Sequence, residues 1–269
     1  MEFGNYSTKI PGTNVTVDDV VAKGLFRYDP MRKKLECPFI WIYMMARHRK
    51  HDILWRMLRI TAENSTSLYS ASEAAPGSRM WWQDWERFAM GYRALRSASY
   101  ANTPIRYSEL HRGASLNLTA KQDVEIVPMP LKMVSSSYQV NTMKPPDIIQ
   151  CEMENVDITA CRHIILNGES ALAGDSFCCV RLGEGGYLRE IHQCKLVSGG
   201  ALTRTIMEAE RKKAARDEDY FLIFSTYDTV ALANIPPMTG IVVRENFRDY
   251  FGPFFSRAVF LASINRPPY

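Results

Sequence analysis

The stretch Phe177–Val197, which reads FCCVRLGEGGYLREIHQCKLV, decides how the second half of this chain folds. Two runs rich in apolar residues, 177–182 and 187–197, flank the four residues GEGG, which are typical of a turn. We therefore predict a β-hairpin here. The glycines do not form a phosphate-binding loop, because they lack the spacing and the following helix that such a loop requires.

The same pattern of short apolar runs separated by turn residues extends on both sides of the hairpin. It predicts further strands over 115–119, 124–129, 131–140, 148–153, 163–166, 220–225, 239–243 and 258–264. A helix is predicted at 201–216, where Leu202, Ile206 and Ala209 recur at helical spacing. Closely spaced strands favour an antiparallel β-sandwich-like domain at 101–269, with this one inserted helix.

The first third of the chain has a different pattern and contains all five tryptophans. Apolar residues recur at helical spacing in two segments, which predicts amphipathic helices at about 39–62 and 79–97. We therefore expect an extended arm at 1–15 and an α-rich, aromatic and basic region at 16–100. The predicted fold class is α+β, with a helical N-terminal third followed by the antiparallel β-sandwich-like domain.

The composition is that of a globular protein, with 46% hydrophobic and 23% charged residues in a chain of 269. No apolar run approaches the length of about 18 residues that a membrane-spanning helix needs. The first residues, MEFGNY, do not resemble a signal peptide, so we expect an intracellular protein, cytoplasmic or nuclear, or in the host cytoplasm or virion if it is viral. The six cysteines are interpreted as reduced thiols, mostly buried.

The net charge of +4 is concentrated in one place, the basic stretch 32–59. It contains Arg32, Lys33, Lys34, Arg47, Arg49, Lys50, Arg56 and Arg59 against only two acidic residues, Glu36 and Asp52. Such a stretch could contact nucleic acid or an anionic membrane surface. The alternative is a solvated helical face whose arginine stems pack on aromatic side chains.

Two short segments carry residues that suit a metal ion, Cys161-Arg162-His163 and His192-Gln193-Cys194. Residues two apart in a strand project from the same face, so each segment could offer a sulfur and a nitrogen to one tetrahedral zinc. The alternative is ordinary buried cysteines with half-exposed histidines. Zinc is the one cofactor that the sequence suggests, and no pattern identifies a catalytic residue.

Carboxylates between the predicted strands could in principle form an acid/base pair or a divalent cation site. They are Asp147, Glu152, Glu154, Asp157, Glu169 and Asp175. Acidic residues in such loops are more often solvent-facing turn formers, and we interpret these residues in that way.

Both ends of the chain carry residues that could anchor an arm in a groove, notably Phe3 and Tyr6 near the start and Arg266 and Tyr269 at the end. Exchanged arms are a common way to build symmetric assemblies. The leading hypothesis is therefore a self-assembling structural protein such as a viral capsid, matrix or occlusion-body subunit, with itself as partner in a homo-oligomer. The alternatives are an enzyme or ligand-binding protein with a site in the β domain, and a nucleic-acid-binding nucleoprotein that uses Arg47, Arg49 and Lys50.

Overall fold

A computed structural model describes Thr16 and residues 27–29, 34–36, 82–168, 173–197, 199–230 and 235–252. The chain divides into two compact units, Met1–Ala62 and Glu63–Tyr269. In the first unit, β1 (Arg27–Asp29) and β2 (Lys34–Glu36) form an antiparallel hairpin with Tyr28 opposite Leu35. The helix predicted at 39–62 and the strand predicted at 258–264 lie outside the described residues. So do the anchor residues of both arms and, apart from Lys34–Glu36, the basic stretch.

The second unit contains the remaining elements. In chain order they are α4 (Trp82–Ser99), β3 (Ile105–Arg106), α5 (Tyr107–Leu110), β4 (Ser115–Asn117), β5 (Glu125–Ile126), β6 (Lys132–Ser135), β7 (Ile148–Gln150), β8 (Asn155–Asp157), η1 (Ile158–Ala160), β9 (His163–Leu166), β10 (Ser176–Arg181), β11 (Tyr187–Lys195), β12 (Ala201–Leu202), α6 (Arg204–Ala214), β13 (Tyr220–Ser225), β14 (Thr229–Val230), β15 (Thr239–Val242) and η3 (Arg244–Asn246). Residues 247–252 continue as helix. No helix among the described residues is long and apolar enough to span a membrane.

The hairpin predicted from the glycine-rich turn is confirmed. Strands β10 and β11 pair antiparallel, with Cys178 opposite Glu190. Gly185 and Gly186 in the turn have φ angles of +99° and +80°, which glycine adopts without strain. The helix predicted at 79–97 is confirmed as α4, and the helix predicted at 201–216 is confirmed over Arg204–Ala214 as α6. Its first two predicted residues, Ala201 and Leu202, form strand β12 instead.

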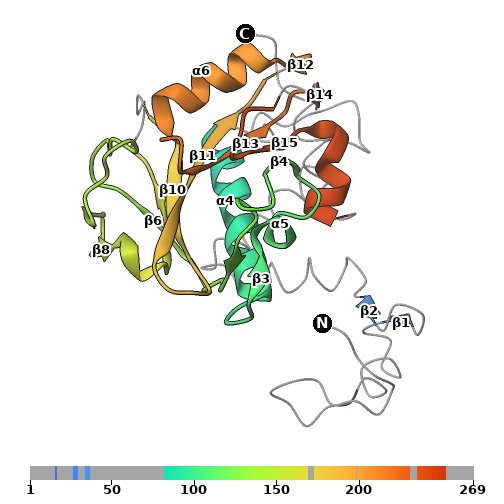
Figure 1. The fold of residues 1–269 in the computed structure, drawn as a ribbon, viewed down its shortest axis with the longest axis horizontal. Helices are drawn as coiled ribbons and strands as arrows, with labels where there is room; N and C mark the ends of the chain where they lie inside the picture. Colours follow the sequence, from blue (N-terminus) through green and yellow to red (C-terminus); the bar gives the residue numbers. More distant parts are fainter. Residues whose placement is uncertain are drawn as a thin grey trace, which may run out of the picture. The chain divides into compact units, whose positions relative to one another are not determined.

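The central sheet is mixed, so the prediction of an antiparallel sandwich holds only as a β-rich domain in a mixed α/β fold. Its seven strands have the order β4-β15-β13-β11-β10-β9-β6. The pairs β11–β13, β13–β15 and β6–β9 are parallel, and the remaining pairs are antiparallel. Strands β11 and β13 can pair in parallel because of α6, which is part of the sheet topology and is not an insertion into an antiparallel domain. This helix is the crossover that carries the chain from the end of β11 back to the start of β13, as a parallel pair requires (Figure 1).

The two faces of this sheet bury different partners, because alternate residues of each strand point to opposite sides. One face contributes Phe177, Ile191 and Phe221 to an apolar core that includes Met207 and Ala214 of α6. We call it the α6 face. The opposite face, which we call the α4 face, is covered by α4.

On the α4 face, two aromatic side chains of α4 are buried. Trp85 and Phe88 are 0% and 1% exposed, and Trp85 Nε1 donates a hydrogen bond to the carbonyl of Phe224 at 3.1 Å. The ring of Phe88 also lies 5.2 Å, centroid to centroid, from that of Phe251. These aromatic side chains therefore supply core contacts to the sheet and to the helix that contains Phe251.

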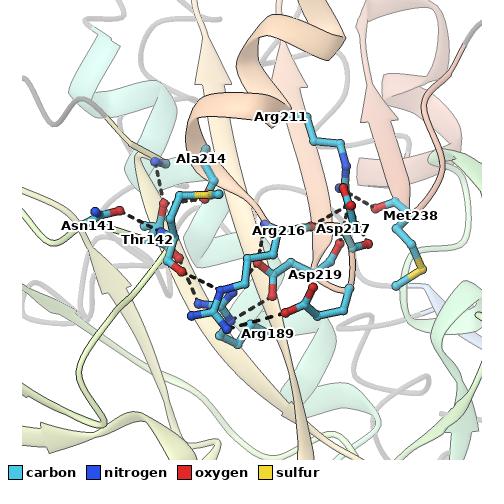
Figure 2. Close-up of polar contacts among 12 residues, drawn as sticks. Asn141, Thr142, Arg189, Arg211, Ala214, Arg216, Asp217, Asp219 and Met238 are labelled. Carbon is cyan, nitrogen blue, oxygen red and sulfur yellow. Dashed lines mark hydrogen bonds and ion pairs between the residues drawn. The ribbon is translucent and has the colours of Figure 1, made fainter.

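A network of arginine contacts joins the end of α6 to the start of β13 (Figure 2). The guanidinium of Arg189 on β11 donates to Asp219 Oδ1 at 2.8 Å and to the carbonyl of Thr142 at 3.0 Å. Arg211 of α6 donates to the carbonyls of Arg216 and Asp219 at 2.9 and 3.1 Å. These contacts connect β11, the end of α6 and the start of β13. They therefore fix the position of the helix relative to these two strands.

Candidate functional site

The opposite edge of the sheet collects polar side chains from several segments. Strands β11, β13 and β15 are parallel, so their carboxyl ends meet there. Strand β10 runs the other way, so Asp175, immediately before it, reaches the same edge. Ligands of open α/β sheets bind beyond the carboxyl ends of the parallel strands. We call this place the carboxyl edge.

Asp175 is fixed at this edge by its backbone and its side chain. Its N–H donates to the carbonyl of His192 at 3.0 Å. Its Oδ2 accepts hydrogen bonds from Gln193 Nε2 and from the backbone N–H of Cys194, both at 2.6 Å. The preceding residue must be small, because a Cβ on Gly174 would lie 2.5 Å from Cγ2 of Ile191. The pair Gly174-Asp175 thus lets the carboxylate approach the end of β11.

The surroundings of Asp175 oppose its ionisation on balance. Burial raises the pKa of its carboxyl group, while the hydrogen bond from Cys194 N–H and the charge of Lys195 lower it. The negative charge of Glu210 acts in the raising direction, which indicates that this second carboxylate is close. A cation beside Asp175 would favour the ionised form.

Gln193 supplies a buried oxygen atom that has no hydrogen-bond partner among the described residues. Its side chain is 4% exposed, and Oε1 accepts no hydrogen bond from any residue that the structure describes. The Nε2 of the same amide donates a hydrogen bond to Asp175 Oδ2, so the amide group lies beside the carboxylate. A buried acceptor without a donor costs about 1–3 kcal/mol. Carboxylate and amide oxygens are the ligands that Mg²⁺ and related hard cations take, so a bound cation would remove this cost.

Lys195, two residues further along β11, brings a positive charge to the carboxyl edge. Its Nζ lies 3.1 Å from Glu210 Oε1 of α6, and Glu210 Oε2 lies 2.5 Å from Lys213 Nζ. Gln193 and Lys195 share the α6 face because they are two apart in the strand. The carboxyl edge therefore combines a carboxylate, an unpartnered amide oxygen and an ammonium group.

The charge of Glu86 on α4 also acts on a residue at this edge, Cys194. Cys194 points to the α4 face, and burial raises the pKa of its thiol well above the ordinary value. The negative charges of Asp175 and Glu86 add to this effect, which indicates that both carboxylates lie near the sulfur. Cys194 is thus a protonated thiol packed beneath the site.

The structure does not gather the four residues predicted to bind zinc. His163 begins β9, on the same face as Ile165 and the α6-face core, which also contains Cys161. His192 and Cys194 lie on the α4 face, at the end of β11. Cys161 and His163 therefore lie on the opposite face of the sheet from His192 and Cys194. Strands β9 and β11 run in the same direction, so the first two residues are near the start of their strand and the last two are near the end of theirs.

His192 belongs instead to a fully buried cluster around Glu190. Glu190 accepts from Arg93 Nε at 2.6 Å, and its oxygens lie 3.1 Å from His111 Nε2 and 2.7 Å from His192 Nε2. Ligand atoms of Cys178, Glu190 and His192 lie within 4.8 Å of one another, a spacing that could hold a metal ion. The carboxylate is already saturated by cationic and imidazole partners, and it is 0% exposed. We therefore assign the Glu190 cluster a structural role.

Sequence reasoning passed over the three residues that define the carboxyl edge. Asp175 was interpreted as a turn former, and Gln193 and Lys195 were not singled out. A signal was present in the hairpin itself, since Ser176 pairs with His192, which places Asp175 opposite Gln193. The register of the hairpin could have revealed this pattern. An acidic residue precedes one strand, and it faces a Gln-x-Lys sequence at the end of the other strand.

Comparison with known proteins gives one informative similarity. No protein-family model and no solved structure matches the chain. Crinkler effector protein 108 of Phytophthora sojae is 30% identical to it over 268 residues. The similarity spans 97% of this chain and 31% of that protein, so the chain corresponds to less than a third of its relative. The hypothesis of a self-assembling viral capsid, matrix or occlusion-body subunit was wrong, because the chain is similar to an effector protein and not to a structural one.

Proposed function

We propose that this chain is a divalent-cation-dependent nuclease whose reaction takes place at the carboxyl edge. The observation that carries the proposal is the buried Gln193 Oε1, which has no hydrogen-bond partner among the described residues and belongs to the amide that donates to Asp175. An unpartnered amide oxygen next to a carboxylate indicates a positively charged ligand that would contact both Gln193 and Asp175. Lys195 at the same edge indicates that this ligand works on an anionic group.

The donor set favours Mg²⁺ or Mn²⁺ over zinc. Asp175 and Gln193 offer hard oxygen atoms, whereas zinc sites are usually built from sulfur and imidazole nitrogen. The hydrogen bonds from Gln193 and Cys194 to the Asp175 carboxylate both go to Oδ2, so none of the described residues that bond to this carboxylate occupies Oδ1, where a cation could bind. Magnesium commonly takes one or two carboxylates and completes its shell with water and phosphate oxygens. The Asp175 carboxylate and the Gln193 amide oxygen at the carboxyl edge could supply the protein ligands of such a site.

Phosphodiester hydrolysis uses all three groups. When bound, the cation polarises a phosphate oxygen and lowers the pKa of a water molecule. Lys195 donates hydrogen bonds to the non-bridging oxygens and stabilises the charge that grows on them. The water oxygen forms a bond to phosphorus, the bond from phosphorus to one ester oxygen breaks, and that oxygen takes up the proton that water loses. Diester and water give monoester and alcohol, and no oxidant or reductant is required.

Nucleic acid is the phosphodiester that suits the chain best. The net charge of +4 favours a polyanion, and the basic stretch 32–59 would add contacts to phosphates outside the site. The similarity to Crinkler effector protein 108 supports the setting of an effector. We propose that the chain is the catalytic part of an effector and that it works inside a cell, in the cytoplasm or nucleus.

The experiment is a cleavage assay with the purified chain on supercoiled plasmid DNA and on a labelled RNA oligonucleotide, each with and without Mg²⁺ or Mn²⁺. Cleavage should require the cation, stop with EDTA, and fall by about 100-fold or more in Asp175→Asn and in Lys195→Met. Glu208→Gln serves as the matched control, because this exposed carboxylate also lies on α6 and forms its ion pair with Arg204 of the same helix. Cleavage that survives EDTA or Asp175→Asn would refute the proposal, and so would a chain that cuts neither substrate and binds no Mn²⁺.

A further inference from the structure

We infer that Glu210 is a positioning residue for Lys195, and that it holds the ammonium group at the carboxyl edge where the scissile phosphate would lie. This inference rests on the proposed function and names a residue that the reaction itself does not require. It starts from the ion pair of 3.1 Å between Lys195 Nζ and Glu210 Oε1.

The pair differs from the other ion pairs of α6. Arg204 and Glu208, four residues apart on the helix, are 59% and 50% exposed, as expected of a surface pair that contributes little. The side chain of Glu210 is 14% exposed, and it joins the helix to the last residue of β11. Removing Glu210 would therefore break a contact between two elements at the site, in addition to its ion pair with Lys213 on the helix itself.

Lys195 needs a residue that fixes its ammonium group, because its side chain is flexible. A lysine ammonium is a point charge on a flexible four-carbon stem, so it does not set its own direction as an arginine fork does. The reaction gains from this charge only when the charge is already near the phosphate oxygens. One oxygen of Glu210 forms the ion pair with Lys195, and the other lies 2.5 Å from Nζ of Lys213, three residues further along α6, as an ion pair without hydrogen-bond geometry. The carboxylate is thus fixed on the helix and can fix the lysine in turn.

The alternative is that Glu210 competes with phosphate and restrains the enzyme. The two roles predict opposite effects of Glu210→Gln, which keeps the size of the side chain and removes its charge. As a positioning residue, Glu210 supports turnover. As a competitor, it slows turnover, and its removal would accelerate the reaction.

The test compares wild type, Glu210→Gln, Glu210→Asp and the control Glu208→Gln in the full chain. Cleavage is measured as kcat and KM, Mn²⁺ binding by electron paramagnetic resonance, and folding by thermal unfolding. The reactivity of Lys195 towards an amine-directed acylating reagent is followed by peptide mass spectrometry. Glu210→Gln should lower kcat about tenfold with KM and Mn²⁺ affinity nearly unchanged, an effect in the range of residues that support a site from behind. Lys195 should be acylated several-fold faster, because the free amine is no longer engaged, and Glu208→Gln should match wild type in every measurement.

Each outcome decides the inference. Unchanged acylation of Lys195 in Glu210→Gln overturns it, whatever the cleavage assay gives. Unchanged or faster cleavage with faster acylation also overturns it, because the ion pair would then be idle or inhibitory. If wild type itself cleaves nothing, the proposed function fails, and faster acylation in Glu210→Gln would still establish Glu210 as the holder of Lys195. Glu210→Asp, which retains the charge on a shorter side chain, should fall between wild type and Glu210→Gln.

Discussion

Two carboxylates of the same hairpin, Glu190 and Asp175, have opposite environments. Glu190 is 0% exposed and is surrounded by Arg93, His111 and His192. Burial alone would raise its pKa, but the charge of Arg93 and the imidazole contacts hold it well below the ordinary value. Burial also acts on Asp175, where its neighbours do not compensate, and its pKa is raised. A carboxylate with all its partners in place holds a fold together, whereas one beside an unpartnered oxygen is suited to bind a ligand.

The sharpest way to break this comparison is to remove Glu190. Glu190→Ala leaves Arg93 charged and unpaired in a site where its side chain is 1% exposed. Breaking a buried pair by deleting one partner costs about 3–5 kcal/mol, so we expect a loss of unfolding free energy of that size in urea. The exposed Glu208→Ala should change it by less than about 0.5 kcal/mol. A Glu190→Ala chain as stable as wild type would remove the structural role that we give to the cluster.

The same cluster predicts how stability depends on pH. Burial lowers the pKa of His111 to about 4, below the ordinary value of 6.5. Above pH 6.5 the imidazole is neutral in both the folded and the unfolded chain, so its contribution to stability is fully present. As the pH falls from 6.5 to 4, the unfolded chain takes up a proton that the folded chain refuses, and up to about 3 kcal/mol is lost.

The measurement for His111 is urea unfolding at several values between pH 7 and 4. His111→Gln should show a shallower loss over this range, because one proton fewer distinguishes the two states. Arg93, Glu190 and Tyr250 face the imidazole, and Glu190 adds its own loss of stability only below its unfolded pKa of 4.5. Equal slopes for wild type and His111→Gln would show that His111 titrates alike in both states.

At the carboxyl edge the comparison predicts the reverse pattern, a large effect on activity with little effect on stability. Asp175→Asn should reduce cleavage and Mn²⁺ affinity by about 100-fold, because the charged ligand is gone. Its unfolding free energy should change by no more than about 1 kcal/mol, since the amide oxygen can still accept from Cys194 N–H and burial no longer opposes a charge. A loss of stability as large as that of Glu190→Ala would place Asp175 in the structural class.

Local patterns predicted the elements well and their pairing less well. The turn 183–186 and the helical spacing of Trp85, Phe88 and Tyr92 depend on neighbouring residues, so the hairpin and α4 could be read from the sequence. The parallel pairing of β11 with β13 depends on the path of α6 over the sheet, and a strand pattern does not encode direction.

The same distinction holds for the two polar sites. Asp175 and Gln193 are brought together by one hairpin, 18 residues apart, and hairpin register could have predicted this contact. Arg93 and Glu190 are 97 residues apart and meet only because α4 packs on the sheet. No local pattern links them, which is why the sequence suggested a zinc role for His192 when its actual partner is the carboxylate of this ion pair.

The smallest expected effect tests how far the carboxyl edge extends along α6. Lys213 contacts the same carboxylate as Lys195, but its side chain is 45% exposed, so solvent screens the pair. Lys213→Gln should therefore lower kcat by less than about threefold, which is what the loss of an exposed pair worth up to about 0.6 kcal/mol allows. Lys212→Gln is the matched control in the same cleavage assay, because Lys212 lies two residues after Glu210 and side chains at this spacing do not face each other on a helix. A tenfold loss in Lys213→Gln would mean that the anchoring of Glu210 on the helix matters as much as Glu210 itself, and the functional site would then include the last turn of α6.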